Sequence, residues 1–332
     1  MRILMLRSAH VQAAKVLPPP GGDLKNCQDV WTLLFDGLCR RLDAEGLIWR
    51  WGPPTQGTYR PGLREIWGRD SSEAAAFAPD VIINRGGYGA YLPALRLARP
   101  KFKGYYGAGC RWLPRDKVAY DVIWVDTPGQ RQEVMRRWPN KDVRHLIKPA
   151  AETVFFPRAA DKIYDAAVIC HMAREKKGLP WLAANLPAGL SVLRVGQPDE
   201  WFFRAAQEGR LTVTFTGLVD RRQVAERLSQ CRCSIVADDG QWDANPRILA
   251  ESLACGVPVV VRACVRTDFS RYVPAEAGAV FHENRKDLAA ALRMVLAGEL
   301  GTAPRNIYAK NCSMGVAVED LAGPILEKLN AA

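Results

Sequence analysis

The chain lacks any long hydrophobic run: nowhere in its 332 residues do apolar residues approach the roughly 18 in succession that a membrane-spanning helix needs. The opening MRILMLRSAH has too short an apolar part, and turns polar too soon, to serve as a signal peptide. It is typical of a first β-strand instead. We therefore expect neither a membrane-spanning nor a secreted protein, and predict a cytoplasmic one.

Patterns of metal ligands are also missing. The nine cysteines form no CxxC pair, and the four histidines are dispersed along the chain. Zinc sites need closely spaced cysteines or histidines, so we predict no metal and no cofactor. Cysteines in apolar stretches are typical of reduced, buried thiols in the cytosol.

The first half of the chain has few acidic residues for its number of basic ones. Residues 1–150 hold 24 Lys and Arg against 14 Asp and Glu, whereas residues 151–332 hold 22 against 21. Almost all of the net charge of +11 therefore lies in the first half. This asymmetry predicts that the first half binds an anionic partner.

Short apolar runs alternate with amphipathic helical stretches along the whole chain. Examples are RILMLR at 2–7 and DVIINR at 80–85, then YDAAVICH at 164–171 and VPVVVR at 257–262. Continuous apolar strands between helices indicate parallel sheets that are covered on both faces. Two such sets predict an α/β fold with two Rossmann-like, doubly wound domains. Ligands of such sheets bind at the carboxyl ends of the strands, so we expect the site in a cleft between the domains.

A stretch without periodicity, IKPAAETVFFPRAADK at 147–162, separates the two sets of strands. We place the first domain at residues 1–150 and the second at 151–303. Residues 304–332 are predicted to form a helical tail, broken at Gly315 and Gly323, that crosses back toward the first domain.

The stretch DANPRILAESLACGVPVVV, which begins at Asp243, combines a helix start with two carboxylates. Asn245 is a favourable N-cap, and Gly256 is a favourable helix end. A helix start offers free N–H groups to a phosphate. Asp243 and Glu251 would lie about 12 Å apart along a helix, too far apart to share one metal ion or one proton. They suit the two ends of a long hydroxylated ligand such as a nucleotide sugar.

This stretch resembles the carboxylate–seven–carboxylate motif of the retaining GT-B glycosyltransferases, a large family of enzymes with two Rossmann-like domains. The portion ESLACGVPVVV carries the most specific part of the resemblance. The resemblance implies that Glu251 holds the donor ribose and that Asp243 contacts the donor sugar. It also places Asn245 and Arg247, which stand where the family has a glycine-rich turn, at the donor.

Other segments resemble the same family in the same order. VLPPPGGD, with Gly21 and Gly22, resembles the glycine loop whose backbone approaches the donor phosphates, although a plain turn is an equal alternative. TFTGLVDRRQVAERLSQCRCSIVAD at 214–238 resembles the strand–loop–helix–strand before the acidic motif. It implies that Gly217 and Leu218 lie near the nucleotide base.

HMAREKKG at 171–178 resembles the segment whose Arg and Lys bind the donor diphosphate. The resemblance assigns this role to Arg174 and Lys177, although the family places its Arg five residues before the Lys. A solvated charge cluster is the alternative. Many relatives carry a catalytic histidine after the fourth strand, where this chain has YYGAGCRW without one. His10 is then the only histidine expected near the cleft, in a catalytic, sugar-contacting or structural role.

The resemblance implies retaining, metal-independent transfer of a hexose or pentose from a nucleotide sugar to a hydroxyl group. Cationic groups would stabilise the leaving diphosphate. The acceptor hydroxyl would attack on the same face, helped by a phosphate oxygen. The donor would bind to the domain at 151–303, and the acceptor mostly to the domain at 1–150.

The densest basic run of the first half, residues 96–117, indicates the kind of acceptor. It includes Lys101, Lys103, Arg111 and Arg115, with aromatic residues between them. Such a run suits nucleic acid, whose bases stack on aromatic rings. It also suits an anionic membrane surface, or core aromatics beneath solvated cations.

Two acceptors therefore stay open: a hydroxylated base in nucleic acid, as in phage-type DNA glycosylation, and a lipid or cell-surface glycan at the membrane. The sequence shows no clear basic amphipathic surface helix, which favours the nucleic acid. A protein that binds sugar nucleotides or nucleic acid without catalysis is an alternative of a different class.

Overall fold

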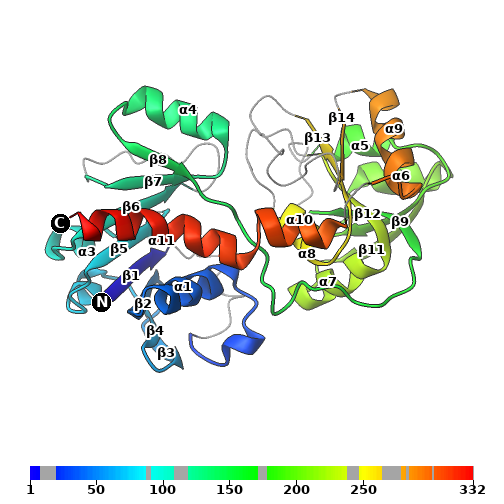
Figure 1. The fold of residues 1–332 in the computed structure, drawn as a ribbon. Helices are drawn as coiled ribbons and strands as arrows, with labels where there is room; N and C mark the ends of the chain where they lie inside the picture. Colours follow the sequence, from blue (N-terminus) through cyan, green and yellow to red (C-terminus); the bar gives the residue numbers. More distant parts are fainter. Residues whose placement is uncertain are drawn as a thin grey trace. The chain divides into compact units, whose positions relative to one another are not determined.

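The computed structural model describes residues 1–7, 20–86, 91–107, 119–170, 178–237, 247–263, 278–281, 284–300 and 303–331. The chain folds into two compact units (Figure 1). Unit 1 comprises Met1–Ile147 with Met314–Ala332, and unit 2 comprises Lys148–Ser313. Each unit has one largely parallel sheet with helices on both faces. The predicted α/β fold with two doubly wound domains is therefore confirmed.

Unit 1 is built on an eight-stranded sheet in the order β3-β4-β2-β1-β5-β6-β7-β8. Neighbouring strands are parallel except β3 and β4, which form an antiparallel edge. The strand order reverses between β1 and β5, whose carboxyl ends mark the switch point where doubly wound sheets bind ligands. The strands are β1 (Arg2–Arg7), β2 (Glu45–Trp51), β3 (Thr55–Arg60), β4 (Leu63–Gly68), β5 (Val81–Arg85), β6 (Phe102–Gly107), β7 (Val122–Val125) and β8 (Asp142–His145).

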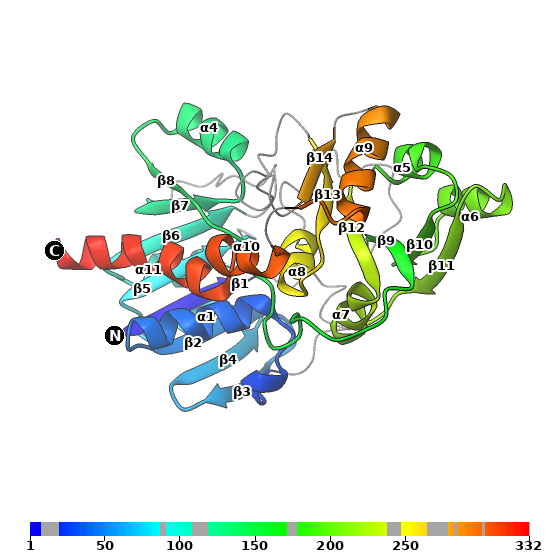
Figure 2. The same ribbon diagram turned by 45° about the vertical axis from the view of Figure 1, so that its right-hand side comes forward.

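Helices cover both faces of this sheet. The helices of unit 1 are η1 (Leu24–Asn26), α1 (Val30–Arg41), α2 (Ser72–Ala75), α3 (Leu92–Leu97), α4 (Pro128–Arg137) and α11 (Met314–Asn330). Figures 1 and 2 show α1 and α11 side by side on one face, and α2, α3 and α4 pack on the other. Alternate residues of a strand point to opposite faces. Leu4 and Leu6 thus join the core with α2 and α3, whereas Arg7 points toward α1.

Unit 2 contains an all-parallel sheet in the order β11-β10-β9-β12-β13-β14. This is the strand order of dinucleotide-binding folds, with the switch point between β9 and β12. Its strands are β9 (Tyr164–Ile169), β10 (Ser191–Val195), β11 (Thr212–Gly217), β12 (Cys231–Val236), β13 (Val259–Arg262) and β14 (Gly278–Phe281). Its helices are α5 (Leu179–Asn185), α6 (Glu200–Gln207), α7 (Arg221–Ser229), α8 (Ile248–Ala254), α9 (Arg285–Leu296) and α10 (Pro304–Asn311).

The two faces of the unit 2 sheet are covered by different helices. α5, α6 and α9 share one apolar core with the strands. α8 packs on the opposite face, where the hydroxyl of Ser234 on β12 donates to the hydroxyl of Ser252 at 2.8 Å. The carboxyl ends of β9 and β12 are thus held between two layers of helix.

The predicted tail is divided between the units. α10 packs on α8 in unit 2, and α11 packs on α1 in unit 1. The helix break falls at Cys312 and Ser313. The predicted breaks at Gly315 and Gly323 are wrong, because both glycines lie inside α11. Burial of one apolar face of α11 outweighs the local cost of glycine in a helix.

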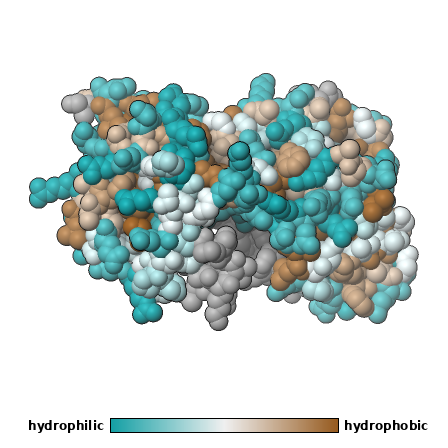
Figure 3. Space-filling view, turned by 90° about the horizontal axis from the view of Figure 1, so that it is seen from below, coloured by the Kyte–Doolittle hydropathy of each residue, from teal (hydrophilic) through white to brown (hydrophobic). Residues whose placement is uncertain are grey.

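Within the described part of the chain, no helix is both long and apolar enough to cross a membrane. On the face shown in Figure 3, apolar residues form small groups that hydrophilic residues separate. Exposed apolar side chains, such as those of Leu97 and Phe203, are ordinary on protein surfaces.

Candidate functional site

Two segments of unit 2 leave the sheet at its switch point. One follows β9 and carries Arg174 and Lys177, and the other follows β12 and carries Asp243 and Asn245. All four residues lie outside the described residues, so their roles stay predictions. Because β9 and β12 are paired neighbours, both segments start at the same edge of the sheet.

The points at which these segments start are fixed by close backbone packing. Gly178 has φ +67°, and a Cβ there would lie 2.1 Å from the carbonyl oxygen of Ala237, just after β12. Only glycine fits such a position. At the end of β9, the fully buried Arg194 donates to the carbonyl oxygen of Cys170 at 3.3 Å and pairs with Asp199 at 2.7 Å. The backbone at the switch point of unit 2 is therefore closely packed and hydrogen-bonded.

Glu251 is buried in the first turn of α8, with 6% of its surface exposed. Its carboxylate accepts a hydrogen bond of 2.5 Å from Arg221, the first residue of α7. The guanidinium of Arg221 also lies over the ring of Phe155, 5.0 Å from its centroid. The structure thus gives Glu251 a cationic partner that the sequence pattern did not indicate.

α8 begins later than predicted. Its first helical residue is Ile248 and its cap is Arg247, so the predicted start at Asn245 is wrong and Glu251 lies in the first turn, not the second. Asp243 therefore lies before the helix by more residues than expected. The predicted donor contacts of Arg247 stay a prediction.

Gly217 and Leu218 come shortly before Arg221 in the sequence. Gly217 ends β11 with φ +71°, and Leu218, 56% exposed, follows it three residues before Arg221. Because Arg221 bonds to Glu251, the residues predicted for the base and for the ribose are connected through one ion pair. Their contacts with a nucleotide stay predictions.

Gly21 and Gly22 pack against the edge strand β3. The N–H of Gly22 donates to the carbonyl oxygen of Thr58 at 3.2 Å, and a Cβ on Gly21 would lie 2.9 Å from the nitrogen of Thr58. Both glycines have positive φ, +93° and +106°. This packing requires glycine whether or not a phosphate binds, so the predicted phosphate role stays a prediction.

Unit 1 holds a row of arginines that the sequence analysis did not single out. Arg50, Arg7 and Arg85 are register partners at the carboxyl ends of the neighbouring strands β2, β1 and β5. Side chains at paired positions of a sheet point to the same face. The row therefore crosses the switch point of unit 1. The only sequence signal for it was that RILMLR, GLIWR and VIINR each end in arginine.

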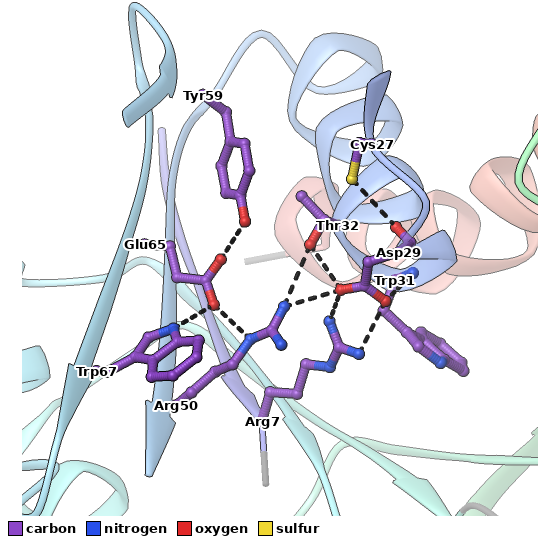
Figure 4. Close-up of polar contacts among 9 residues, drawn as sticks. All are labelled: Arg7, Cys27, Asp29, Trp31, Thr32, Arg50, Tyr59, Glu65 and Trp67. Carbon is purple, nitrogen blue, oxygen red and sulfur yellow. Dashed lines mark hydrogen bonds and ion pairs between the residues drawn. The ribbon is translucent and has the colours of Figure 1, made fainter. Parts of the chain in front are cut away.

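Two carboxylates, the partly exposed Asp29 and the buried Glu65, neutralise part of this row (Figure 4). Asp29, the N-cap of α1, accepts hydrogen bonds from both terminal nitrogens of Arg7 and, at 2.8 Å, from Arg50. Glu65 on β4 pairs with Arg50 and accepts a hydrogen bond of 2.7 Å from the indole N–H of Trp67. Tyr59 donates its hydroxyl hydrogen to the same carboxylate.

The charges of this network shift the pKa values of its members. Burial would raise the pKa of Asp29, but the charges and hydrogen bonds of Arg7 and Arg50 outweigh it and hold this pKa well below its usual range. Burial, with the nearby Glu65 carboxylate, raises the pKa of Tyr59. Burial also raises the pKa of the Cys27 thiol to about 11. Asp29 is therefore ionised, and Cys27 is a neutral thiol, at physiological pH.

Arg85 lies against two aromatic rings. Its guanidinium carbon lies 4.1 Å from the ring centroid of Trp31, in the first turn of α1, and 6.0 Å from that of Tyr106. The two rings are 4.8 Å apart, and Tyr106 donates its hydroxyl hydrogen to Asp126. The guanidinium and both rings form one cluster at the end of β5 and β6.

The structure describes only residues 96–107 of the basic run at 96–117, so the predicted surface is tested only for this part. Its aromatic residues Phe102, Tyr105 and Tyr106 are buried in the sheet and cannot stack on bases. Lys101 and Lys103 lie at the amino end of β6, away from the carboxyl ends that carry the arginine row. Lys101 pairs with Asp80 at 3.6 Å. Arg111 and Arg115 lie outside the described residues.

Of the four histidines, only His145 belongs to the described part of the chain. His10 lies outside the described residues, and its role stays a prediction. His145, at the end of β8, also lies at the carboxyl edge of unit 1, and its Nε2 is 2.5 Å from the carbonyl oxygen of Asp126. Among the residues that the structure describes, no group of three or more His, Cys, Asp or Glu could hold a metal ion.

Comparison with known proteins agrees with this arrangement. Residues 165–298, most of unit 2, match the family described as glycosyl transferases group 1. No curated protein matches the sequence. Three similar solved structures are a glycosyltransferase from Rickettsia africae, sucrose-phosphate synthase from Thermosynechococcus elongatus and a glycosyltransferase involved in avilamycin A biosynthesis.

Each of these three matches covers 100% of this chain. In the order named, they cover 99%, 100% and 98% of the other chain. Their TM-scores are 0.73, 0.70 and 0.70, and their sequence identities 12%, 15% and 16%. At such identities the likeness shows the fold, while the family match identifies the domain in unit 2. The predicted fold is confirmed, because the chain has the GT-B fold, and residues 165–298 match the family of group 1 glycosyltransferases that the sequence resembles.

Proposed function

We propose that the protein moves a sugar from a nucleotide-sugar donor, bound by unit 2, to a hydroxyl group of an acceptor recognised by unit 1. The observation that carries this proposal is the agreement between the family match at 165–298 and the switch point of unit 2. The segments that carry Arg174, Lys177 and Asp243 all start at that switch point.

Glu251 is the residue that we assign to the donor ribose. A buried carboxylate accepts hydrogen bonds from two neighbouring hydroxyl groups, and charge-assisted bonds of this kind are strong. Arg221 holds the carboxylate in one orientation through its hydrogen bond. Gly217 and Leu218, just before Arg221, are assigned to the nucleotide base, where the exposed apolar side chain of Leu218 offers a contact surface.

For the chemical step, Arg174 and Lys177 would neutralise the diphosphate as it leaves, and Asp243 would hold the sugar. In many enzymes, most of the rate acceleration comes from stabilising the charge that develops in the transition state. The acceptor hydroxyl would attack on the face from which the diphosphate leaves, which retains the anomeric configuration. We propose that this step needs no metal ion.

The acceptor that we propose is an anionic compound with a free hydroxyl group. The charge excess of residues 1–150 supports an anionic acceptor. The nucleic-acid proposal now rests on that charge alone, because three of the aromatic residues expected to stack on bases are buried. The alternative acceptor, a lipid at an anionic membrane surface, is supported by the same charge. Transfer assays with DNA and with lipid extracts distinguish the two acceptors.

A panel of nucleotide sugars tests the donor part of the proposal. A ligand that binds the folded state raises the melting temperature, so one nucleotide sugar should raise it more than the free nucleotide. Slow hydrolysis of that donor by the purified protein would then distinguish an enzyme from a binding protein. If no nucleotide sugar of the panel changes the melting temperature or is hydrolysed, the proposed function is wrong.

A further inference from the structure

The backbone is anchored at both ends of the pair between Arg221 and Glu251. Ser252, the residue after Glu251, accepts a hydrogen bond of 2.8 Å from a serine of β12, which ties α8 to the sheet. α7 begins with a capping box: the N–H of Gln223 donates to the side chain of Asp220 at 2.9 Å, and the N–H of Asp220 donates to the side chain of Gln223 at 3.0 Å. Arg221 is the first residue after this cap. The pair therefore joins two fixed helix starts.

The guanidinium of Arg221 is restrained from a second side by Phe155. Its carbon lies 5.0 Å from the centroid of this ring. Phe155 is fully buried, and its N–H donates to the carbonyl oxygen of Ala151 at 2.9 Å. A cation over an aromatic ring is attracted by the negative face of the ring. Arg221 therefore has a defined place between ring and carboxylate, although a quarter of its side chain is exposed.

The two oxygens of the Glu251 carboxylate have different surroundings. Oε1 accepts the hydrogen bond of 2.5 Å from the guanidinium of Arg221. In the part of the chain that the structure describes, no group donates to Oε2, and the side chain is 7% exposed. Oε2 is thus the oxygen left for a hydroxyl group of a ligand. Because Oε1 is bonded, the direction in which Oε2 points is fixed as well.

An acceptor with a fixed direction discriminates between ligands with and without the matching hydroxyl group. A ligand that carries the hydroxyl pairs with the buried oxygen. A ligand that lacks it keeps water out and leaves this oxygen unpaired, which is costly. A carboxylate that could turn would find another partner, and the cost would be smaller. The selectivity therefore depends on the residue that prevents the carboxylate from turning.

We propose that Arg221 is a positioning residue that makes unit 2 selective for a nucleotide with an intact ribose over its deoxy forms. This inference rests on the proposed function, in which Glu251 binds the donor ribose. It adds the residue on which the selectivity of that carboxylate depends. Arg221 acts through Glu251, by fixing the direction of Oε2.

The test compares ribose with deoxyribose in binding experiments without turnover. ADP, CDP, GDP and UDP are titrated by calorimetry into the wild-type protein, and the tightest is compared with its 2′-deoxy and 3′-deoxy forms. The same comparison is made for Arg221→Gln, Arg221→Lys, Glu251→Gln and the double variant with both glutamines. The control is Arg227→Gln. Arg227 is exposed in the last turn of α7 and donates to Gln230 at 3.1 Å, so this variant removes one positive charge from the same helix.

We expect the wild type to bind the ribose form about ten-fold or more tightly than at least one deoxy form, because hydrogen bonds to charged groups are strong. Arg221→Gln should reduce this ratio at least about three-fold, as for coupled neighbours. Arg221→Lys should keep more of the ratio, and Arg227→Gln all of it. The double variant should show the ratio of Glu251→Gln alone, because Arg221 acts through Glu251. A merely structural role of Arg221 would weaken binding of both forms alike.

Two results would overturn the inference and leave the proposed donor site in place. In the first, Arg221→Gln keeps the wild-type ratio while Glu251→Gln loses it. In the second, Arg227→Gln loses as much of the ratio as Arg221→Gln does. If no nucleoside diphosphate binds, or if Glu251→Gln also keeps the ratio, the assignment of Glu251 to the ribose is wrong, and the inference is wrong with it. Melting curves show which variants are folded, and Arg221→Lys gives the comparison if Arg221→Gln is unfolded.

Discussion

Arg221 and Glu251 form an ion pair, with 2.5 Å between guanidinium nitrogen and carboxylate oxygen, that joins the start of α7 to the first turn of α8. The carboxylate is buried, whereas a quarter of the Arg221 side chain is exposed. A ribose that donates hydrogen bonds to Glu251 would therefore meet an acceptor that is already held in one orientation. The binding energy of the ribose would not be spent on ordering this side chain.

Replacing Glu251 by Gln should weaken binding of the preferred nucleotide sugar by roughly 1.5–3 kcal/mol, because charge-assisted hydrogen bonds become neutral ones. Isothermal calorimetry measures the loss. The control is Glu208→Gln, which also breaks an ion pair with an arginine of unit 2, but at the surface. Equal affinity in the wild type and in a folded Glu251→Gln protein would remove Glu251 from the donor site.

Transfer should continue at the same rate after exhaustive chelation. In the proposed step, the positive charges of Arg174 and Lys177 stabilise the leaving diphosphate. Asp238 and Asp239 are directly adjacent and do not form the spaced acidic pair of transferases that use a metal ion. Turnover is measured in EDTA and again after addition of magnesium or manganese. Loss of turnover in EDTA that either metal restores would contradict the proposed metal independence.

Asp29→Asn should lower the free energy of unfolding at pH 7 by roughly 2–4 kcal/mol, because it leaves two buried arginines without their shared carboxylate. Asn still caps α1, so the loss reports the charge and not the cap. Urea denaturation measures it. Glu319→Gln, which breaks the exposed pair with Arg41, should cost less than about 1 kcal/mol.

The same variant should change how stability depends on pH. The pKa of Asp29 is lower in the folded state than in the unfolded state, where it is about 3.9. The contribution of Asp29 to the free energy of unfolding is therefore complete above that unfolded-state pKa and is lost as the pH falls below it. The difference in free energy of unfolding between wild type and Asp29→Asn should therefore be constant from about pH 5 to 7 and shrink below about pH 4. A difference that stays the same down to about pH 3 would show that the charge is not its cause.

Ile325→Ala should destabilise unit 1 by about 2–5 kcal/mol, because this fully buried side chain of α11 leaves a cavity. Glu319→Gln is again a suitable control on the same helix. Thermal unfolding by calorimetry would show the loss. An unchanged melting temperature would mean that α11 does not pack on unit 1 in solution.

The sequence predicted the buried strands of both sheets because each is a short apolar run between helical stretches. It missed the hairpin β3–β4, whose first strand, TQGTYR, has almost no apolar residues and forms an edge. It also missed α2, which has only four residues, and α6. The wrong breaks at Gly315 and Gly323 came from local propensity, which the packing of α11 outweighs.

Two features of the candidate site depend on three-dimensional neighbours that no local pattern contains. Arg221 and Glu251 are 30 residues apart, and only the packing of α7 beside α8 brings them together. The arginine row requires the order of β2, β1 and β5 and their register. Conversely, Tyr105 and Tyr106 looked available for stacking because the composition of a run does not say which face of a strand is buried.

The most direct test of the account is sugar transfer by the purified protein, with its preferred nucleotide sugar as donor and glucose 6-phosphate, glucuronate, hydroxymethylated DNA and a lipid extract as separate acceptors. The account predicts release of nucleoside diphosphate and a glycosylated product with one of these acceptors, with the anomeric configuration retained. A protein that binds no nucleotide sugar, or binds one without hydrolysis or transfer to any of these acceptors, would contradict it.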